Sequence, residues 1–353
     1  MLLKYKISVI IPTFNAEDYL LDAVNSVKNQ TIGFENIELI LVDDNSNDNT
    51  RAIFKELSEN HENIKTYFLE YNSGSAGQPR NIGIKHSTAD YIMFLDSDDC
   101  YLPDMCEVMF ETISKYDCDI VSCRFRQKSE NKTILPYYYL EKFNPKKMNL
   151  NDREFHDDAI IINSINNHPE LLSLSHHILI WNKIFKKEII EKNKITFLEG
   201  AYYEDANFVC NFLFKSENIV FLTKYFGYSY RIRQGDDSSV CHDYSQPMVK
   251  KQMMGFLNAM KSLKKEENDF NSFKSEFIVD ITKIYFYSKL EKEYENEFLN
   301  TMKPFYKQYK INSKLNSTKL PYNIIINIFI KLFGFSNSIT KLASRFFQMR
   351  KMD

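Results

Sequence analysis

The chain has 353 residues, of which 44% are hydrophobic and 26% charged, and its formal net charge is −2. This is the composition of a globular protein with room for one large domain or several smaller ones, and nine glycines with nine prolines exclude collagen-like and disordered classes. The six cysteines form no CxxC pair, which argues against a zinc or dithiol site and favours buried thiols in a reducing compartment. We expect no signal peptide, because the apolar run Ile7–Ile11 is short and stops at Pro12.

The first 125 residues alternate apolar runs with amphipathic segments. The predicted strands are Ile7–Ile11, Glu38–Val42, Ile64–Leu69, Tyr91–Leu95 and Asp119–Phe125. The predicted helices between them are about Ala16–Gln30, Arg51–Asn60 and Pro79–His86. Strands that alternate with helices indicate an α/β fold with a mostly parallel sheet and helices on both faces. No GxGxxG is present, so the dinucleotide-binding fingerprint is absent.

The second half of the chain is less regular. Gln127–Pro169 is polar and its pattern does not place it, whereas Ile178–Phe185 is again apolar. A helix is predicted over Ala206–Phe214, and Tyr228–Arg233 is typical of a short strand. From about Met248 the pattern is helical and charged, so we expect a division into residues 1–235 and a helical region at 236–353.

The C-terminal tail is basic. From Thr301 onward it holds ten Lys and Arg against one acid, while the rest of the chain holds 35 basic and 46 acidic residues. Tyr322–Phe333 is apolar but too short to span a bilayer, and Ser338–Met349 has one apolar helical face. Such a tail can lie on an anionic membrane surface, or its helices can pack on the rest of the chain or on another subunit of a homo-oligomer.

Polar groups follow three of the predicted strands. They are Thr13 with Asn15, Asp43 with Asp44, and the cluster Asp96, Asp98 and Asp99. Ligands of open α/β sheets bind at the carboxyl ends of the strands, where these groups would meet. Three carboxylates within four residues repel one another unless a cation lies between them, and a hard divalent cation carrying a diphosphate is the natural partner. The alternative for the last cluster alone is an exposed acidic turn.

Six motifs, taken in order, resemble those of the family 2 glycosyltransferases of the GT-A fold. They are ISVIIPTFNAEDYL, LILVDDNSNDNT, SAGQPRNIGI, ADYIMFLDSDD, WNKIF and YYEDANF. The resemblance covers about Lys6–Arg233, with the nucleotide-sugar half at about 1–125 and the acceptor half at about 126–235. Within the family, the pattern is most similar to bacterial enzymes that build envelope polysaccharides or decorate teichoic acids.

The resemblance implies a donor site at the edge of the sheet. Asp98 would be the main ligand of Mn²⁺ or Mg²⁺, with Asp96 as a second ligand or a contact to the ribose, and Asp44 would bind the nucleobase. The full set of implied donor-binding residues is Pro12, Thr13, Asn15, Glu17, Asp44, Arg80, Asp96, Ser97, Arg231 and Arg233.

Several of these residues have simpler interpretations. Asn15 can cap the first helix, and Asp99 can cap a helix that starts near Leu102. Arg80 can be a surface residue, pair with the diphosphate, or brace Asp96. Arg231 and Arg233 would lie on one side of a strand, where they can clamp the diphosphate or only blunt an exposed sheet edge.

The ED pair of YYEDANF is the implied catalytic centre. Asp205 would be the general base that deprotonates the acceptor hydroxyl, and Glu204 would orient it. Asp205 can also be the N-cap of the helix Ala206–Phe214, which is compatible with the catalytic role.

The resemblance therefore implies a metal-dependent, inverting glycosyltransferase that uses a nucleotide-sugar, with UDP as the expected nucleotide. Its acceptor would be a cell-envelope glycan, a teichoic acid or a lipid-linked molecule, and no nucleic-acid partner is expected. We expect a cytoplasmic protein, peripheral on the inner face of the membrane. The alternatives are a nucleotidyltransferase that makes nucleotide-sugars, whose Gly-rich basic N-terminal signature is missing, and a non-catalytic binding or scaffold protein. Retention of configuration requires a different arrangement, which the sequence alone leaves open.

Overall fold

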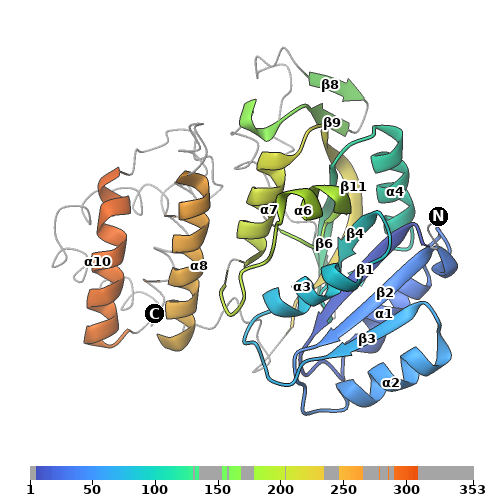
Figure 1. Ribbon diagram of the computed structural model, residues 1–353, viewed down its shortest axis with the longest axis horizontal. Helices are drawn as coiled ribbons and strands as arrows, with labels where there is room; N and C mark the ends of the chain where they lie inside the picture. The colour runs from blue at the N-terminus through green and yellow to red at the C-terminus, as the bar shows by residue number, and fades with distance from the viewer. Residues whose placement is uncertain are drawn as a thin grey trace. The chain divides into compact units, whose positions relative to one another are not determined.

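The computed structural model describes residues 5–129, 132–134, 153–156, 159–167, 179–202, 204–233, 246–264, 278, 285 and 290–308. The chain divides into two compact units, Met1–Gly235 and Asp236–Asp353 (Figure 1).

The N-terminal unit is built on one large mixed sheet, in which neighbouring strands run in the order β3-β2-β1-β4-β10-β6-β11-β9-β8. The parallel half comprises β1 (Ile7–Thr13), β2 (Ile37–Asp43), β3 (Ile64–Phe68) and β4 (Tyr91–Phe94). The other half comprises β6 (Ile120–Ser129), β8 (Arg153–His156), β9 (Ala159–Ile162), β10 (Lys183–Lys186) and β11 (Ile219–Arg231). Two short strands lie off this path, β5 (Cys100–Tyr101) beside β11 and β7 (Lys132–Ile134) beside β6.

The sheet is parallel where the sequence pattern was regular. The four N-terminal strands pair in parallel, and so do β6 and β11. Strand β10 is antiparallel to both β4 and β6, and β8 and β9 add an antiparallel edge. The prediction of an α/β fold with a mostly parallel sheet is confirmed, and the antiparallel edge comes from the segment 127–169 that the pattern did not place.

Helices cover both faces of this sheet (Figure 1). On one face lie α1 (Leu20–Lys28), α2 (Thr50–Asn60) and α4 (Met105–Lys115), and on the other lie α3 (Gly77–His86), α6 (Lys187–Asn193) and α7 (Glu204–Lys215). The alternation of side chains along β4 fits this arrangement, because Tyr91 meets Phe110 of α4 whereas Phe94 meets Phe208 of α7. Two short 3-10 helices, η1 (Phe34–Asn36) and η4 (Ile165–Asn167), complete the described elements of this unit.

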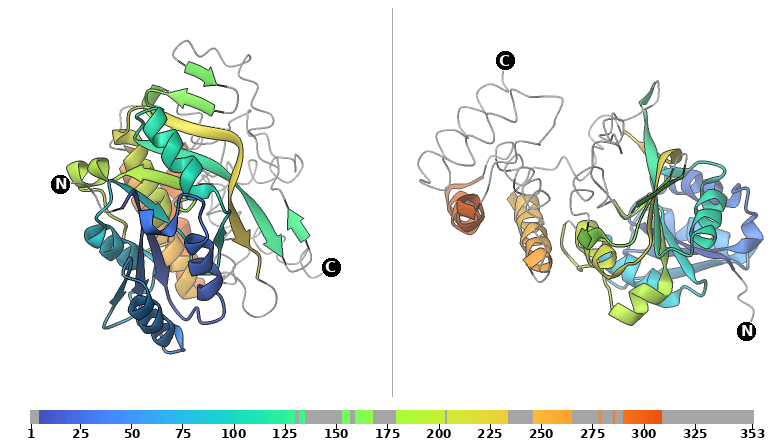
Figure 2. Two further views of the ribbon diagram at one scale, coloured as in Figure 1. Left: turned by 90° about the vertical axis from the view of Figure 1, so that its right-hand side faces the viewer. Right: turned by 90° about the horizontal axis from the view of Figure 1, so that it is seen from above.

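Two predicted elements have different bounds in the structure. Helix α1 begins at Leu20 and not near Ala16, since Asn15 has a left-handed backbone (φ 46°) and the chain turns before the helix starts. Strand β11 begins at Ile219, nine residues before the strand predicted at Tyr228. It is the long, curved yellow strand in the left view of Figure 2. Its register against β6 shifts between Phe221 and Tyr228, so a bulge interrupts the alternation that the sequence pattern relies on.

The C-terminal unit contributes two long helices to the described part of the chain, α8 (Gln246–Lys264) and α10 (Lys292–Gln308). Within this unit Tyr285 stacks on Phe298 of α10 with ring centroids 4.8 Å apart. No helix among the described residues is long and apolar enough to cross a membrane. The tail segments Tyr322–Phe333 and Ser338–Met349 lie outside the described residues.

An aromatic layer fills the space between the sheet and α7. Phe94 of β4 and Phe185 of β10 both make edge contacts with Phe208 of α7, and Phe197 stacks on Phe208 at 4.0 Å. The guanidinium of Arg80 lies over the Phe197 ring, 5.4 Å from its centroid. The apolar core therefore extends directly up to the charged groups at the edge of the sheet.

Helix α3 approaches the sheet unusually closely. A Cβ atom added to Gly83 would lie 2.4 Å from Cγ2 of Ile10, well inside van der Waals contact, so only glycine lets the helix pack this close to β1. Arg80 lies one turn before Gly83 on the same helix. This packing brings the Arg80 side chain to the carboxyl edge of β1 and β4.

Candidate active site

The polar groups at the carboxyl ends of β1, β2 and β4 meet at one edge of the sheet, as the sequence predicted. Thr13 pairs with Asp43 in the register of β1 and β2, and the backbone N–H of Asp44 donates to the Thr13 carbonyl at 2.8 Å. The N–H of Leu95 donates to the carbonyl of Ile10 at 3.1 Å, which places Asp96 beside the same strand end. The parallel pairing of three strands is what gathers these residues from distant parts of the sequence.

Asp44 and Asp43 differ in their partners. The Asp44 carboxylate accepts bonds from the N–H and the hydroxyl of Ser73, at 2.8 and 3.0 Å, and burial raises its pKa. Asp43 is fully buried and accepts bonds from the Arg51 side chain at 2.6 Å and from the N–H of Ser46. Asp43 therefore holds the turn after β2 together.

Asn15 and Glu17 join the loop after β1 to the turn after β2. The Asn15 side chain accepts a bond from the N–H of Asn47 at 3.0 Å, and Glu17 accepts bonds from the backbone and side-chain N–H groups of Asn49 at 2.9 and 2.6 Å. The prediction that Asn15 caps the first helix is wrong, because the N-cap position is Tyr19 and no side chain caps that helix. Pro12 and Thr13 are buried at the end of β1, where this loop begins.

Arg80 is the centre of the charged cluster. Its side chain is 4% exposed and binds three carboxylates from two distant parts of the chain. Nη2 donates to Oδ1 of Asp96 at 2.8 Å, and Nη1 donates to Oδ1 of Asp205 at 2.5 Å and to Oε1 of Glu204 at 3.1 Å. Of the roles considered for Arg80, the structure therefore has it bracing Asp96, and it adds a link to the ED pair that the sequence did not predict.

Glu204 and Asp205 form the start of α7. The helix begins at Glu204, so the prediction that Asp205 is the N-cap of a helix starting at Ala206 is wrong, and both carboxylates lie in the first turn. Burial raises the pKa of Asp205 to about 8, helped by Glu204 and Asp96 and opposed mainly by Arg80. A carboxylate with a pKa near neutral pH is well matched to accepting a proton from a hydroxyl group.

Arg231 and Arg233 lie beside the acidic turn. Arg233 donates two bonds to Oδ2 of Asp98, at 2.9 and 2.6 Å, whereas Arg231 donates to the Asp98 carbonyl at 2.9 Å and to Asp22 at 2.7 Å. Strand β11 ends at Arg231, and both guanidinium groups lie over the Tyr19 ring, 5.3 and 4.9 Å from its centroid. The two cations therefore share one side, as predicted, close to Asp98.

Asp99 is not a helix cap, and that prediction is wrong. Helix α4 begins at Met105, and the Asp99 side chain is buried against β11. Its carboxylate accepts the Tyr228 hydroxyl at 2.7 Å and the N–H of Arg231 at 2.6 Å, while burial holds its pKa well above the usual range. Asp99 thus anchors the end of β11, and with it the basic pair, to the acidic turn; Ser97 lies half-buried in the same turn.

The donor set at this turn fits a hard divalent cation shared with a phosphate ligand. Asp96 and Asp98 supply carboxylate oxygens, the ligand type that Mg²⁺ and Mn²⁺ prefer. Across the described residues, no group of three or more His, Cys, Asp or Glu side chains is arranged to hold a metal ion. Further ligands would therefore have to come from the bound molecule, and a diphosphate supplies them.

Sequence reasoning grouped WNKIF with the acceptor side but assigned no role to its members. Trp181 stacks on Tyr228, whose hydroxyl binds Asp99, with ring centroids 4.1 Å apart. Asn182 donates to the carbonyl of Cys123 at 2.7 Å, and Lys183 is fully buried. The sequence could have singled out Lys183, because a lysine inside an otherwise apolar run is rarely buried without a reason.

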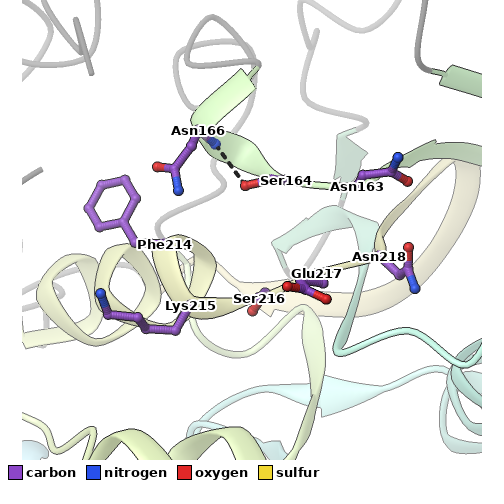
Figure 3. A pocket seen from close by; sticks show the side chains of 8 residues that line it. All are labelled: Asn163, Ser164, Asn166, Phe214, Lys215, Ser216, Glu217 and Asn218. Carbon is purple, nitrogen blue, oxygen red and sulfur yellow. Dashed lines mark hydrogen bonds between the residues drawn. The ribbon is translucent and has the colours of Figure 1, made fainter. Parts of the chain in front are cut away.

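A separate pocket of about 530 Å³ lies away from these groups (Figure 3). It is formed where β9 ends and β11 begins, and the side chains drawn there include Asn163, Asn166 and Glu217. Because β11 is parallel to β6, and β6 runs in the same direction as β4, the start of β11 lies at the sheet edge opposite Asp96. This pocket is therefore not part of the charged cluster.

The order and direction of the strands, with helices on both faces, are those of a GT-A α/β domain. Residues 8–167 match the family model described as Glycosyl transferase family 2. The chain belongs to this family.

Two bacterial glycosyltransferases are similar to this chain. The chain is 34% identical over 223 residues to TarP of Staphylococcus aureus (strain N315), a poly(ribitol-phosphate) β-N-acetylglucosaminyltransferase, covering 62% of this chain and 61% of TarP. It is 30% identical over 240 residues to the glycosyltransferase GlyA of Streptococcus pneumoniae serotype 4, covering 68% of this chain and 32% of GlyA. The chain thus spans less than two thirds of the length of either relative.

Among solved structures, residues 1–349 of S. aureus TarS in complex with UDP-GlcNAc superimpose with a TM-score of 0.63. The sequence identity is 21%, and the match covers 96% of this chain and 92% of the TarS chain. This likeness confirms the fold.

Proposed function

We propose that this chain is a metal-dependent, inverting hexosyltransferase that moves a sugar from a UDP-sugar to a hydroxyl group of a cell-envelope glycan or teichoic acid. The observation that carries the proposal is the Arg80 cluster, in which one guanidinium binds Asp96 on the donor side and Asp205 on the acceptor side. Such a link puts a proton acceptor next to the site where a nucleotide-sugar diphosphate would lie.

The proposed reaction is a single displacement. The Asp205 carboxylate takes the proton of the acceptor hydroxyl, whose oxygen attacks the anomeric carbon while the bond from that carbon to the diphosphate oxygen breaks. The electron pair of the broken bond leaves with the UDP, and configuration inverts because attack and departure are on opposite faces. Glu204 shares Nη1 of Arg80 with Asp205 and so orients the base.

The donor residues keep the roles assigned from the sequence. Asp44 would accept a hydrogen bond from the nucleobase, beside the loop after β1 that holds Asn15 and Glu17. Arg231 and Arg233 would exchange their present carboxylate partners for the diphosphate. Mn²⁺ or Mg²⁺, held by Asp98 and Asp96, would offset the charge that develops on the leaving diphosphate.

The relatives support the choice of substrates. The name of TarP specifies transfer of N-acetylglucosamine to poly(ribitol phosphate), and a Bacillus spizizenii relative that is 30% identical is named a poly(ribitol-phosphate) β-glucosyltransferase. We propose a UDP-hexose or UDP-N-acetylhexosamine donor and an envelope polymer, free or lipid-linked, as acceptor. The basic tail from Thr301 onward would hold the chain at the anionic inner face of the membrane or join subunits.

Metal-dependent UDP binding tests the donor half of the proposal. In calorimetric titrations we expect UDP to bind the wild-type protein at least about tenfold more tightly with Mn²⁺ than with EDTA. The reason is that the metal would join the carboxylate oxygens of Asp96 and Asp98 to the diphosphate oxygens of UDP. Asp98→Asn should abolish this difference, whereas Glu217→Gln, a surface change at the opposite sheet edge, should preserve it. Equal UDP affinity with and without Mn²⁺ in the wild type would contradict metal dependence.

A further inference from the structure

Arg233 places a cation of the chain's own on the carboxylate of Asp98. Its Nε and Nη2 atoms both donate to Oδ2 of Asp98, at 2.9 and 2.6 Å. A carboxylate oxygen has two lone pairs, so these two donors take up the hydrogen-bonding capacity of Oδ2. A metal ion cannot take this oxygen as a ligand unless the guanidinium first leaves it.

The position of Arg233 is built into the end of β11. The N–H of Arg231 donates to Oδ1 of Asp99 at 2.6 Å, and the N–H of Ile232 donates to the carbonyl of Lys128 on β6 at 2.8 Å. The backbone is therefore held on both sides in the two residues before Arg233. This distinguishes the ion pair with the acidic turn from a chance contact between two mobile surface groups.

Both carboxylates that would hold the metal have an arginine partner. Asp96 accepts a bond from Nη2 of Arg80 at 2.8 Å, and Asp98 pairs with Arg233. The Arg80 side chain is 4% exposed and binds two further carboxylates, whereas the Arg233 side chain is 25% exposed. Arg233 is therefore the one of the two that can move aside. A divalent cation alone meets two carboxylates whose negative charges are already balanced.

A diphosphate changes this balance. It brings further negative charge, and its paired oxygens suit the planar N–H donors of a guanidinium. Arg233 can then exchange Asp98 for the diphosphate, and Oδ2 of Asp98 becomes available to a divalent cation that binds the same diphosphate. Arg233 and the cation therefore compete for Asp98 without a nucleotide and act together once the nucleotide is bound.

We propose that Arg233 keeps divalent metal off Asp98 until a nucleotide diphosphate takes its guanidinium, so that metal and nucleotide bind together. The inference rests on the proposed function, in which Asp98 is the metal ligand. It adds an order of events to that function, because metal alone binds poorly and metal with UDP binds well. By linkage, UDP raises the affinity for the metal by the same factor as the metal raises the affinity for UDP.

Mn²⁺ binding without nucleotide tests the proposal and needs no turnover. Measured by the electron paramagnetic resonance of free Mn²⁺, Arg233→Met should bind Mn²⁺ alone about 3–10-fold more tightly than the wild type, since the competing cation is gone. Adding Asp98→Asn to Arg233→Met should remove the gain, which would place it at Asp98. Arg233→Gln, which keeps an N–H donor but no charge, should also show a gain and serves if Arg233→Met does not fold. A wild-type affinity in these Arg233 variants would overturn the proposal.

Lys128→Met separates competition at Asp98 from a general loss of positive charge. Lys128 is exposed and pairs with Arg231 in the register of β6 and β11, so its charge lies in the same region. Its affinity for Mn²⁺ alone should stay within about twofold of the wild type, because solvent screens an exposed charge. A gain as large as that of Arg233→Met would show that net charge alone matters and would contradict the proposal.

The coupling between Mn²⁺ and UDP separates a failure of this inference from a failure of the proposed function. In calorimetric titrations, saturating Mn²⁺ should tighten UDP binding by a smaller factor in Arg233→Met than in the wild type. If Mn²⁺ leaves UDP binding to the wild type unchanged, the metal-dependent function itself is wrong. If Mn²⁺ tightens UDP binding by the same factor in both proteins, only the role of Arg233 is wrong.

Discussion

Asp205→Asn is expected to lower the rate of sugar transfer by about 10²–10⁴-fold, the range that a positioned general base contributes. Asparagine keeps the size of the side chain and can still contact Arg80, but it cannot accept the proton of the acceptor hydroxyl. UDP binding should change little, because in the proposed reaction Asp205, which is bound to Nη1 of Arg80, contacts the acceptor and not the UDP. Steady-state rates of UDP release and a calorimetric UDP titration measure the two effects separately.

The same assignment predicts the direction in which kcat/KM changes with pH. The proposed base Asp205 can accept a proton only when it is ionised, and burial raises its pKa to about 8 in the unliganded protein. The wild-type kcat/KM should therefore fall as the pH drops below this value and level off above it. Glu217→Gln, which removes an exposed carboxylate at the opposite sheet edge, is the matched control and should follow the wild-type profile. An Asp205→Asn protein with wild-type turnover would contradict the assignment.

Arg80→Met is expected to destabilise the protein by about 3–5 kcal/mol and to abolish activity. The change removes the cation that binds Asp96, Glu204 and Asp205 and leaves their negative charges together in a largely buried cluster. The free energy of unfolding, from chemical denaturation at pH 8, measures the loss.

The loss caused by Arg80→Met should shrink as the pH falls. Without Arg80 the pKa values of the three carboxyl groups rise further above their unfolded values, so the folded variant binds protons more readily than the unfolded chain and gains relative stability in acid. Lys186→Met is the control, and its exposed pair with Asp117 should contribute less than about 1 kcal/mol. A loss for Arg80→Met as small as that of the control would show that the cluster is not held by this residue.

The parallel half of the fold followed from the sequence because each element there has a strong local signal. Ile7–Thr13 and Ile37–Asp43 are mostly β-branched or apolar and are buried throughout, and the polar residues at and after their ends had to share one edge once the strands were parallel. The bulged β11 and the antiparallel strands from segment 127–169 gave no comparable signal, since their pairing depends on partners far away in the sequence.

The candidate site residues could be chosen by type, but of their partners only Asp96 for Arg80 was among the sequence-based alternatives. Asp96 and Asp205 were assigned to the two halves of the site from separate motifs, yet the link between them is Arg80, 16 residues from the one and 125 from the other. Asp99 and Asn15 were given local cap roles because caps are the commonest use of such residues. In the structure both bind segments that only the tertiary fold brings near.

The measurement that tests the central claim most directly is UDP release from a panel of UDP-sugars, with Mn²⁺ or with EDTA, by the wild-type protein and by Asp205→Asn. The account predicts that at least one donor is turned over by the wild type, only with the metal, and about 10²–10⁴-fold more slowly by the variant. Release of UDP from no donor, or equal release by wild type and variant, would contradict the assignment of this sheet edge as a glycosyl-transfer site with Asp205 as its base.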